Sequence, residues 1–159
     1  IKLLVQPGQV VVLYFANDGE LSPHIAITQL QQAGVMTLLP VLHPFRKGYL
    51  NFQHYDFSTR LVANRYGINE PAHSSVETVP LQNIDFIFMP LVAFDLHGNR
   101  LGMGGGYFDR TMDRLPLLDK RPRLVGLAHD CQQVAELPFQ SWDIPLDMIL
   151  TPSKKIIAK

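Results

Sequence analysis

The stretch that decides the fold is residues 10–39, which read VVVLYFANDGELSPHIAITQLQQAGVMTLL. It opens with Val10–Phe15, a β-branched and aromatic run that is typical of a fully buried strand. Ser22-Pro23 then predicts the N-cap and first position of a helix, which Gly34 ends. Val35–Leu39 is the next expected strand. A strand, a helix and a strand within about 30 residues predict a right-handed parallel crossover.

Further strands extend this unit into a sheet. Pro40 is expected to stop the second strand, and the section from 43 to 81 is expected to run along the edge of the domain. The remaining expected elements are strands at Tyr49–Tyr55, Ile84–Met89 continuing into Leu91–Phe94, Arg123–Ala128, Met148–Leu150 and Ile156–Ile157, with turns at Gly67–Pro71 and Asp95–Asn99. The pattern predicts one α/β domain over residues 1–159, with an open, mostly parallel sheet and helices on both faces in three α/β/α layers.

Composition excludes several classes of protein. The 159 residues are 47% hydrophobic and 18% charged, which excludes a disordered chain. Fourteen basic residues balance fourteen acidic ones, so no net positive field attracts nucleic acid or an anionic membrane. Cys131 is the single cysteine, and the apolar run Ile87–Phe94 is far shorter than the roughly 18 residues of a membrane span. We expect a cytoplasmic monomer that binds neither membranes nor nucleic acid.

The segment whose residue types indicate a ligand-binding site is Arg100–Arg110, RLGMGGGYFDR. Its four glycines, at positions 102, 104, 105 and 106, allow positive φ and close approach of backbone amides to a ligand. A helix expected from Gly106 or Tyr107 to about Leu115 would point its free N–H groups at this loop. The arrangement predicts a cradle for a polyphosphate, although it matches neither a Walker A loop nor a Rossmann fingerprint. A tight turn before a helix is the alternative.

Two carboxylates are candidates for a metal site. Asp109 lies on the first turn of the expected helix, where it helps to hold Mg²⁺ beside the phosphates. Compensation of the helix dipole or an ion pair is the alternative. In the stretch WDIPLD (142–147), Asp143 or Asp147 lies just before a strand, at an edge where α/β sites open. Loop solvation and capping are the alternatives for that pair.

A longer stretch, Met89–Arg110 (MPLVAFDLHGNRLGMGGGYFDR), resembles the hallmark motif of the 5-formyltetrahydrofolate cyclo-ligase family, also called methenyltetrahydrofolate synthetases. The resemblance covers nearly the whole chain in order. It includes Gly19–Leu21, Leu39–Pro40, Gly67–Pro71 and Trp142–Asp147.

The resemblance implies a reaction. ATP, as co-substrate with Mg²⁺, would phosphorylate the formyl oxygen of 5-formyltetrahydrofolate, with or without a polyglutamate tail. N10 would then close the ring to 5,10-methenyltetrahydrofolate. No general base is evident, so the protein would act by alignment and charge neutralisation.

The resemblance also implies site residues. The expected ATP-binding residues are Arg100, Leu101, Gly102, Met103, Gly104, Gly105, Gly106, Tyr107 and Phe108. The expected folate-binding residues are Phe15, Glu20, Met103, Gly104, Gly105, Gly106 and Tyr107. The expected magnesium ligands are Asp109 and Asp143. Phe15 as a core residue and Glu20 as a solvated carboxylate remain alternatives, and we expect Tyr107 to face ligand and Phe108 to face the core. Arg46-Lys47 is either solvated or attracts a glutamate tail.

Two departures from the family pattern stand out. The family normally begins with a basic helix, whereas this sequence begins at Ile1 with Lys2 as its only early basic residue, so that helix is either not included in the sequence or absent. The acidic turn continues as Leu21-Ser22-Pro23. These departures keep a non-catalytic folate- or nucleotide-binding domain open as an alternative. A sugar-phosphate isomerase or CoA-transferase-like enzyme is the other.

Overall fold

The structure, a computed structural model, describes residues 1–158 and is built around a seven-stranded sheet in the order β11-β10-β9-β6-β1-β2-β3. In chain order its strands are β1 (Val10–Val12), β2 (Met36–Leu42), β3 (Leu50–His54), β6 (Phe86–Pro90), β9 (Arg123–Leu127), β10 (Met148–Leu150) and β11 (Lys155–Ile157). The helical segments are α1 (His24–Gln32), α2 (Tyr107–Thr111) and the 3-10 turns η1 (Leu81–Asn83), η2 (Leu115–Leu117) and η3 (Asp130–Gln132). Two hairpins lie outside the sheet, namely β4 (Leu61–Ala63) with β5 (Asn69–Pro71), and β7 (Ala93–Phe94) with β8 (Arg100–Leu101).

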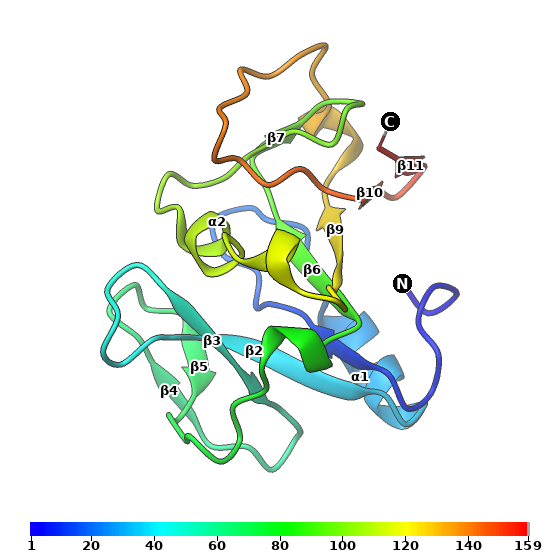
Figure 1. Cartoon of the computed structure of the whole chain (residues 1–159). Helices are drawn as coiled ribbons and strands as arrows, with labels where there is room; N and C mark the ends of the chain where they lie inside the picture. The colour runs from blue at the N-terminus through cyan, green and yellow to red at the C-terminus, as the bar shows by residue number, and fades with distance from the viewer. Residues whose placement is uncertain (159) are drawn as a thin grey trace.

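The five inner strands are parallel, and the edge strands β3 and β11 are antiparallel to their neighbours. The first crossover is as predicted, because β1 leads through α1 to the parallel strand β2, with Val10 opposite Met36. The predicted open α/β sheet is therefore confirmed (Figure 1). No helix within residues 1–158 has the length and apolar character needed to cross a bilayer.

The start of α1 differs from the prediction by one residue. The helix begins at His24, and Pro23 occupies the N-cap position, because the Pro23 carbonyl already accepts the first helical bond from the N–H of Ile27 at 2.9 Å. Ser22 still contributes, since its Oγ accepts a hydrogen bond from the His24 N–H at 3.4 Å. The predicted helix end is confirmed at Gly34, which has the left-handed φ of +78° that favours glycine.

Pro40 does not stop the second strand, contrary to the prediction. The strand continues to Leu42, and Pro40 is paired with Phe52 of β3. The carbonyl of Leu38 accepts the last bond from the β1 side, from the N–H of Leu13. Two residues further on, the nitrogen of Pro40 faces the same side, where no strand needs its missing N–H.

Two other expected strands are shorter than predicted. β1 ends at Val12 rather than Phe15, because the chain leaves the sheet and turns through Asp18 and Gly19 with φ of 48° and 80°. Leu91–Phe94 does not continue β6, because the chain turns after Pro90 and pairs β7 with β8. The middle section follows the sheet edge as predicted, with β3 in place of the expected strand Tyr49–Tyr55.

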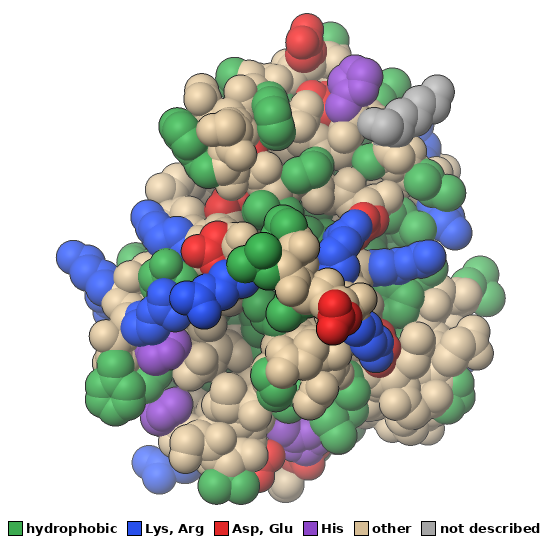
Figure 2. Space-filling model, in the orientation of Figure 1, with side chains coloured by type: hydrophobic (Ala, Val, Ile, Leu, Met, Phe, Trp, Pro, Cys, Tyr) green, Lys and Arg blue, Asp and Glu red, His purple; other side chains and the backbone are tan. Residues whose placement is uncertain are grey.

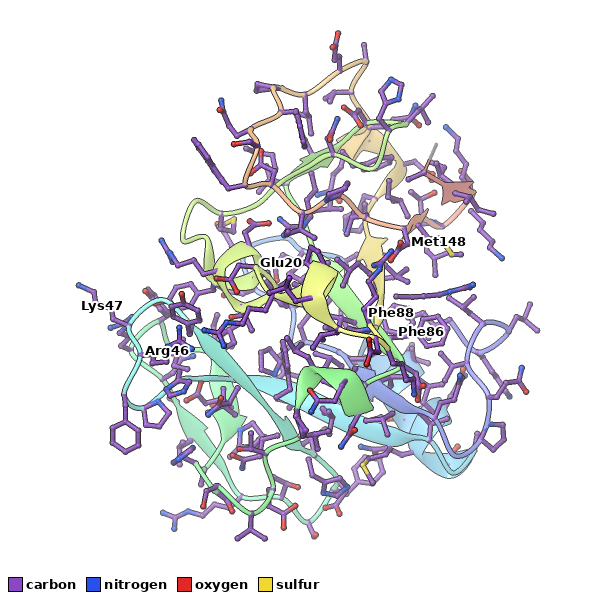
Figure 3. The ribbon with its side chains drawn as sticks, viewed as in Figure 1. Glu20, Arg46, Lys47, Phe86, Phe88 and Met148 are labelled. Carbon is purple, nitrogen blue, oxygen red and sulfur yellow. The ribbon has the colours of Figure 1, made fainter. Side chains whose placement is uncertain are left out.

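Side chains alternate between two hydrophobic layers, one on each face of the sheet. On β6, Phe86 and Phe88 point into the layer that α1 covers with Ile27 and Leu30. Figure 3 labels Phe86, Phe88 and Met148, which all belong to that layer. The intervening residues Ile87 and Met89 point into the opposite layer, which is closed by Met112, Leu115 and the partly buried Phe108. Helical segments therefore cover both faces, as predicted.

Gly126 of β9 occupies a place where a side chain does not fit. An added Cβ would lie 2.6 Å from Leu146 Cδ1 and 2.8 Å from Leu91 Cδ2, and both leucines are buried. We expect Gly126→Ala to lower the free energy of unfolding by about 1–3 kcal/mol through overpacking, measured by urea denaturation. Gly102→Ala is the matched control, because the atom nearest its Cβ lies at 4.0 Å. Equal unfolding midpoints for the two variants would contradict this packing.

Candidate active site

The carboxyl edge of the parallel sheet holds the predicted site residues. β1 and β6 are adjacent and parallel, and the chain leaves β1 toward β2 on one side while β6 lies on the other. Such a reversal of strand order opens a crevice beyond the carboxyl ends of the two strands. The segment with Phe15 and Glu20 follows β1, and the segment that reaches the glycine loop follows β6. The topology therefore brings both predicted segments to the same edge.

The glycine loop, residues 102–106, connects β8 to α2. Gly104 and Gly106 have φ of +90° and +65°, a region that side chains rarely adopt. Leu101 and Met103 are exposed, so the loop faces solvent. Arg110 also holds the loop in place, because its Nη1 donates to the Gly105 carbonyl at 2.7 Å and to the Gly48 carbonyl at 3.3 Å.

The helix after the loop is shorter than predicted. α2 ends at Thr111 instead of reaching Leu115, and the chain continues as a turn and the 3-10 segment η2. Pro116 has no N–H to donate to the Met112 carbonyl, and Leu115 bonds that carbonyl with the tighter i→i+3 spacing at 3.0 Å. A helix of five residues has a small dipole, so the loop's own amides and the adjacent charged side chains dominate the electrostatics here.

Arg100 and Asp109 form an ion pair at the base of the loop. Arg100 Nη2 donates to Asp109 Oδ1 at 2.6 Å, and Nη1 donates to Oδ2 at 3.4 Å. The Arg100 side chain is only 7% exposed, compared with 25% for Asp109. Within residues 1–158, the buried Nε of Arg100 has no hydrogen-bond acceptor. The guanidinium is therefore held in place while its Nε–H donor remains available.

Asp143 shares a small hollow with this pair. The hollow is lined by Asn99, Arg100, Asp109, Pro138, Asp143, Ile144 and Pro145. Asp143 Oδ2 accepts a hydrogen bond from the Gln140 N–H at 2.9 Å, which fixes the turn that carries it. The structure thus brings together the two predicted metal carboxylates from segments 34 residues apart in the sequence.

The donor set of this hollow fits magnesium. Residues 1–158 contain no group of three or more His, Cys, Asp or Glu side chains arranged as a metal cage. Mg²⁺ commonly takes one or two protein carboxylates and completes its shell with phosphate oxygens and water. Asp109 and Asp143 supply that number of hard oxygen ligands beside a candidate phosphate loop. Asp147, the other acidic candidate, lies at the opposite edge, where its Oδ1 pairs with Arg121 at 2.7 Å.

Tyr107 belongs to a cluster that the sequence did not predict. Its hydroxyl hydrogen-bonds that of Tyr66 at 2.7 Å and also accepts from Arg65, both in the turn between β4 and β5. The Tyr66 bond and the Arg65 charge lower the pKa of Tyr107. The only sequence signal was the segment Gly67–Pro71, which marked this turn without indicating where it packs. Phe108 packs into the core, as expected.

Glu20 and Phe15, the two predicted folate-binding residues after β1, lie in different environments. Glu20 is half-buried, and its Oε2 accepts from the Asn17 N–H at 2.9 Å. Burial and the nearby Asp18 raise the pKa of Glu20. Figure 3 labels Glu20, which comes from the loop after β1. Phe15 packs edge-on against Tyr55 with ring centroids 5.4 Å apart and contributes to the core.

A basic surface lies beside the glycine loop. Arg46 and Lys47, in the loop between β2 and β3, are exposed, and the Arg46 guanidinium lies 3.8 Å from the Tyr49 ring centroid. Basic side chains gather on the left flank in Figure 2, where Figure 3 labels Arg46 and Lys47. An open hollow of about 470 Å³ adjoins them, lined by His43, Arg46, Tyr49, Leu50, Asn51, Phe52, Ser75, Thr78, Val79, Pro80, Leu81, Thr111, Asp113 and Arg114. Arg46 contributes to lowering the pKa of His43, after the larger effect of burial.

The fold and the site define an α/β protein of the class that binds its ligand at the carboxyl edge of a parallel sheet, beside a glycine loop. Residues 2–152 match the model of the 5-formyltetrahydrofolate cyclo-ligase family. The chain therefore belongs to that family, as the resemblance predicted.

Individual relatives agree with this assignment. The chain is 47% identical over 144 residues to a 5-formyltetrahydrofolate cyclo-ligase of Escherichia coli strain K12, covering 91% of this chain and 78% of the relative. It is also 47% identical to the Haemophilus influenzae protein of the same name, covering 88% and 74%. An Aquifex aeolicus structure described as a 5,10-methenyltetrahydrofolate synthetase matches with a TM-score of 0.75 and 30% identity, covering 94% and 71%. These findings support the cyclo-ligase interpretation and neither of its alternatives.

Proposed function

We propose that this chain converts 5-formyltetrahydrofolate to 5,10-methenyltetrahydrofolate, with ATP as co-substrate and Mg²⁺ as metal. The observation that carries the proposal is the convergence of Arg100, Asp109 and Asp143 beside the glycine loop, in a chain that belongs to the cyclo-ligase family. Two carboxylates, a guanidinium and a loop of backbone amides are groups that phosphoryl transfer uses.

The chemistry explains why a nucleotide is consumed. The formyl oxygen is bonded to carbon and cannot leave as hydroxide when N10 attacks. Phosphorylation forms a bond between that oxygen and the γ-phosphorus of ATP and breaks the bond between the γ-phosphorus and the oxygen that bridges it to the β-phosphate. ADP is released, and the formyl oxygen becomes part of a good leaving group. N10 then attacks the activated carbon, loses its proton, and phosphate leaves with the former formyl oxygen. The protein needs to align the reactants and neutralise charge, without a strong general base.

The loop and its neighbours have distinct roles in this proposal. Residues 100–108 surround the ATP phosphates, and residues 103–107 also contact the folate. Mg²⁺, held by Asp109 and Asp143, supplies charge neutralisation at the phosphates. The Arg100 guanidinium, released in part from Asp109, offers its donors to phosphate oxygens. Tyr107 presents its ring toward the folate, supported by the hydroxyl of Tyr66.

The two ends of the folate lie toward different surfaces, the pterin toward the loop after β1 and the glutamate tail toward the basic surface. Glu20 accepts hydrogen bonds from the pterin, and Phe15 borders it while packing on Tyr55. Arg46 and Lys47 attract the carboxylates of a glutamate tail, which favours polyglutamylated substrates.

The reaction is tested by following the near-ultraviolet absorbance of the methenyl product. The chain is incubated with 5-formyltetrahydrofolate, ATP and Mg²⁺, and each component is then omitted in turn. We expect product only when all three are present. Ligand binding without product would favour a non-catalytic binder, and product without ATP would contradict the proposal.

The raised pKa of Glu20 gives a pH dependence with a defined sign. Ionised Glu20 accepts pterin hydrogen bonds, so folate binding weakens as pH falls through the Glu20 pKa, which lies above the ordinary glutamate value. We expect KM for 5-formyltetrahydrofolate to rise on acidification through that range. In Glu20→Gln, KM should be high and should lose this pH dependence. An unchanged pH profile in the variant would show that Glu20 does not bind the folate.

A further inference from the structure

Asp95 is a fully buried carboxylate directly after β7, outside the residues assigned to ligands above. Its Oδ1 accepts from the backbone N–H groups of His97 at 2.9 Å and Asn99 at 3.1 Å, which closes the turn between β7 and β8. Its Oδ2 accepts from Asn99 Nδ2 at 2.9 Å and from the Leu137 N–H at 3.1 Å. Burial alone raises the pKa of Asp95, but the bonds from Asn99, Leu137 and His97 outweigh it and lower the pKa. Asp95 is therefore ionised at neutral pH.

The bond to Leu137 reaches a segment that has no helix or strand of its own, residues 134–146. Figure 1 shows this orange segment beside β7 at one end of the molecule. Three bonds fix it to the β7–β8 hairpin. They are Val134 N–H to Phe94 O at 2.9 Å, Leu137 N–H to Asp95 Oδ2 at 3.1 Å, and Leu146 N–H to Gly98 O at 2.9 Å. Of these three bonds, only the one from Leu137 to Asp95 uses a side chain.

Asp95 joins the β7–β8 hairpin to the 134–146 segment, and these two parts of the chain form the two halves of the hollow beside the glycine loop. The hairpin turn ends at Asn99 and leads directly into Arg100, the partner of Asp109. The 134–146 segment carries Asp143. We infer that Asp95 is a positioning residue, which holds Asp143 against the Arg100–Asp109 pair by bonding both halves with one carboxylate. The consequence for magnesium and nucleotide rests on the proposed function, whereas the consequence for the segment does not.

An asparagine at this position cannot make the same four bonds. A carboxylate accepts on both oxygens, but an amide replaces one oxygen with an NH₂ group that only donates. In one orientation the NH₂ group faces the N–H donors of His97 and Asn99. In the other orientation it faces Asn99 Nδ2 and the Leu137 N–H. One of the two halves is therefore released in Asp95→Asn.

Two measurements on the full chain test this inference. Hydrogen exchange should become faster in Asp95→Asn at the Leu137 amide, or at the amides of His97 and Asn99. Binding of ATP with Mg²⁺ should weaken by about 10–100-fold, as is typical when a residue that orients a metal ligand is lost. Trp142 is the sole tryptophan, is 69% exposed and precedes Asp143, so its fluorescence reports this titration. KM for the folate should change by less than about twofold, because Asp95 does not orient Glu20.

The chain offers a matched control for the substitution and a second route to the same effect. Asp85 accepts from the Val10 N–H at 2.9 Å and from Lys120 at 3.0 Å, at the opposite edge of the sheet. Asp85→Asn should reduce stability without changing nucleotide binding. Gly98→Ala should reproduce the Asp95 effect, because its Cβ would lie 2.5 Å from the Leu146 carbonyl oxygen. Gly8→Ala, with a φ of +82° and no atom within 4 Å of its Cβ, controls for backbone strain.

The outcomes separate this inference from the proposed function. Unchanged exchange and unchanged nucleotide binding in Asp95→Asn would overturn the inference, as would equal losses of binding in Asp85→Asn. If Asp95→Asn fails to fold, Gly98→Ala decides, and binding equal to that of Gly8→Ala would overturn it. An unsubstituted chain that neither binds ATP with Mg²⁺ nor forms product contradicts the proposed function. Exchange at the amides of Leu137, His97 and Asn99 then still decides whether Asp95 joins the segment to the hairpin turn.

Discussion

Asp109→Asn is expected to lower Mg²⁺-dependent turnover by about 100-fold or more, while binding of 5-formyltetrahydrofolate stays within about twofold. The substitution removes one of two carboxylates that the hollow offers to a metal. It also removes the charge that faces Arg100, whose side chain is 7% exposed. Losing these charge-assisted bonds should lower the free energy of unfolding by about 1–3 kcal/mol. Rates are therefore compared well below the unfolding midpoint, as a function of Mg²⁺ concentration.

Asp113→Asn is the matched control for this experiment. Asp113 lies four residues further along, is exposed, and does not line the hollow that holds Asp109. Its substitution should leave both the Mg²⁺ dependence and stability unchanged. Equal kinetics for Asp109→Asn and the unsubstituted chain would remove Asp109 from the magnesium site and leave it only as the ion-pair partner of Arg100.

Gly104→Ala is expected to lower kcat/KM for ATP by about 10–100-fold with little change in stability. Gly104 has a φ of +90°, and an added Cβ meets no atom within 4 Å. In the present loop conformation, the added Cβ would therefore cause only backbone strain, of about 1–3 kcal/mol. Because the loop is exposed, the backbone relieves this strain by moving, which displaces the amides that we propose to bind the phosphates. The measurement is steady-state kinetics over a range of ATP concentrations.

Gly34→Ala separates strain in the loop from strain elsewhere. Gly34 also has a positive φ, +78°, and no neighbours within 4 Å of an added Cβ, but it follows α1 at the amino edge of the sheet. Its substitution should lower the unfolding midpoint without changing ATP kinetics. A Gly104 variant that keeps full activity would show that the amides of the loop do not position the phosphates.

The mostly parallel sheet and the places of most of its strands could be predicted because these strands are marked locally, whereas the order of the strands was not predicted. Val10–Val12 and Phe86–Pro90 are runs of apolar residues that only a strand buried on both faces accommodates. The errors occurred where tertiary neighbours decide the outcome. Pro40 is compatible with a strand only because β1 has already left that side, and no local pattern contains that information.

In the site too, residues in local motifs could be predicted, whereas contacts between residues far apart in the sequence could not. The glycine loop, Asp109 and Asp143 were predicted from a contiguous motif and a second short segment, and the structure brings them together. The Arg100–Asp109 pair was predicted only in part, because Arg100 was expected to bind phosphate and an ion pair was an alternative for Asp109 without a named partner. Tyr66 and Arg65 were missed because their contact with Tyr107 joins residues about 40 positions apart. The role of Asp95 was hidden for the same reason, since a turn aspartate normally bonds only its own turn.

The proposed phosphorylation of the formyl oxygen is tested by the fate of that atom. 5-Formyltetrahydrofolate labelled with oxygen-18 in the formyl group is incubated with the chain, ATP and Mg²⁺, and the released phosphate is analysed by mass spectrometry. The proposed reaction predicts one labelled oxygen in each phosphate formed, because the formyl oxygen leaves with phosphorus. Unlabelled phosphate, with the label recovered in water, would contradict it.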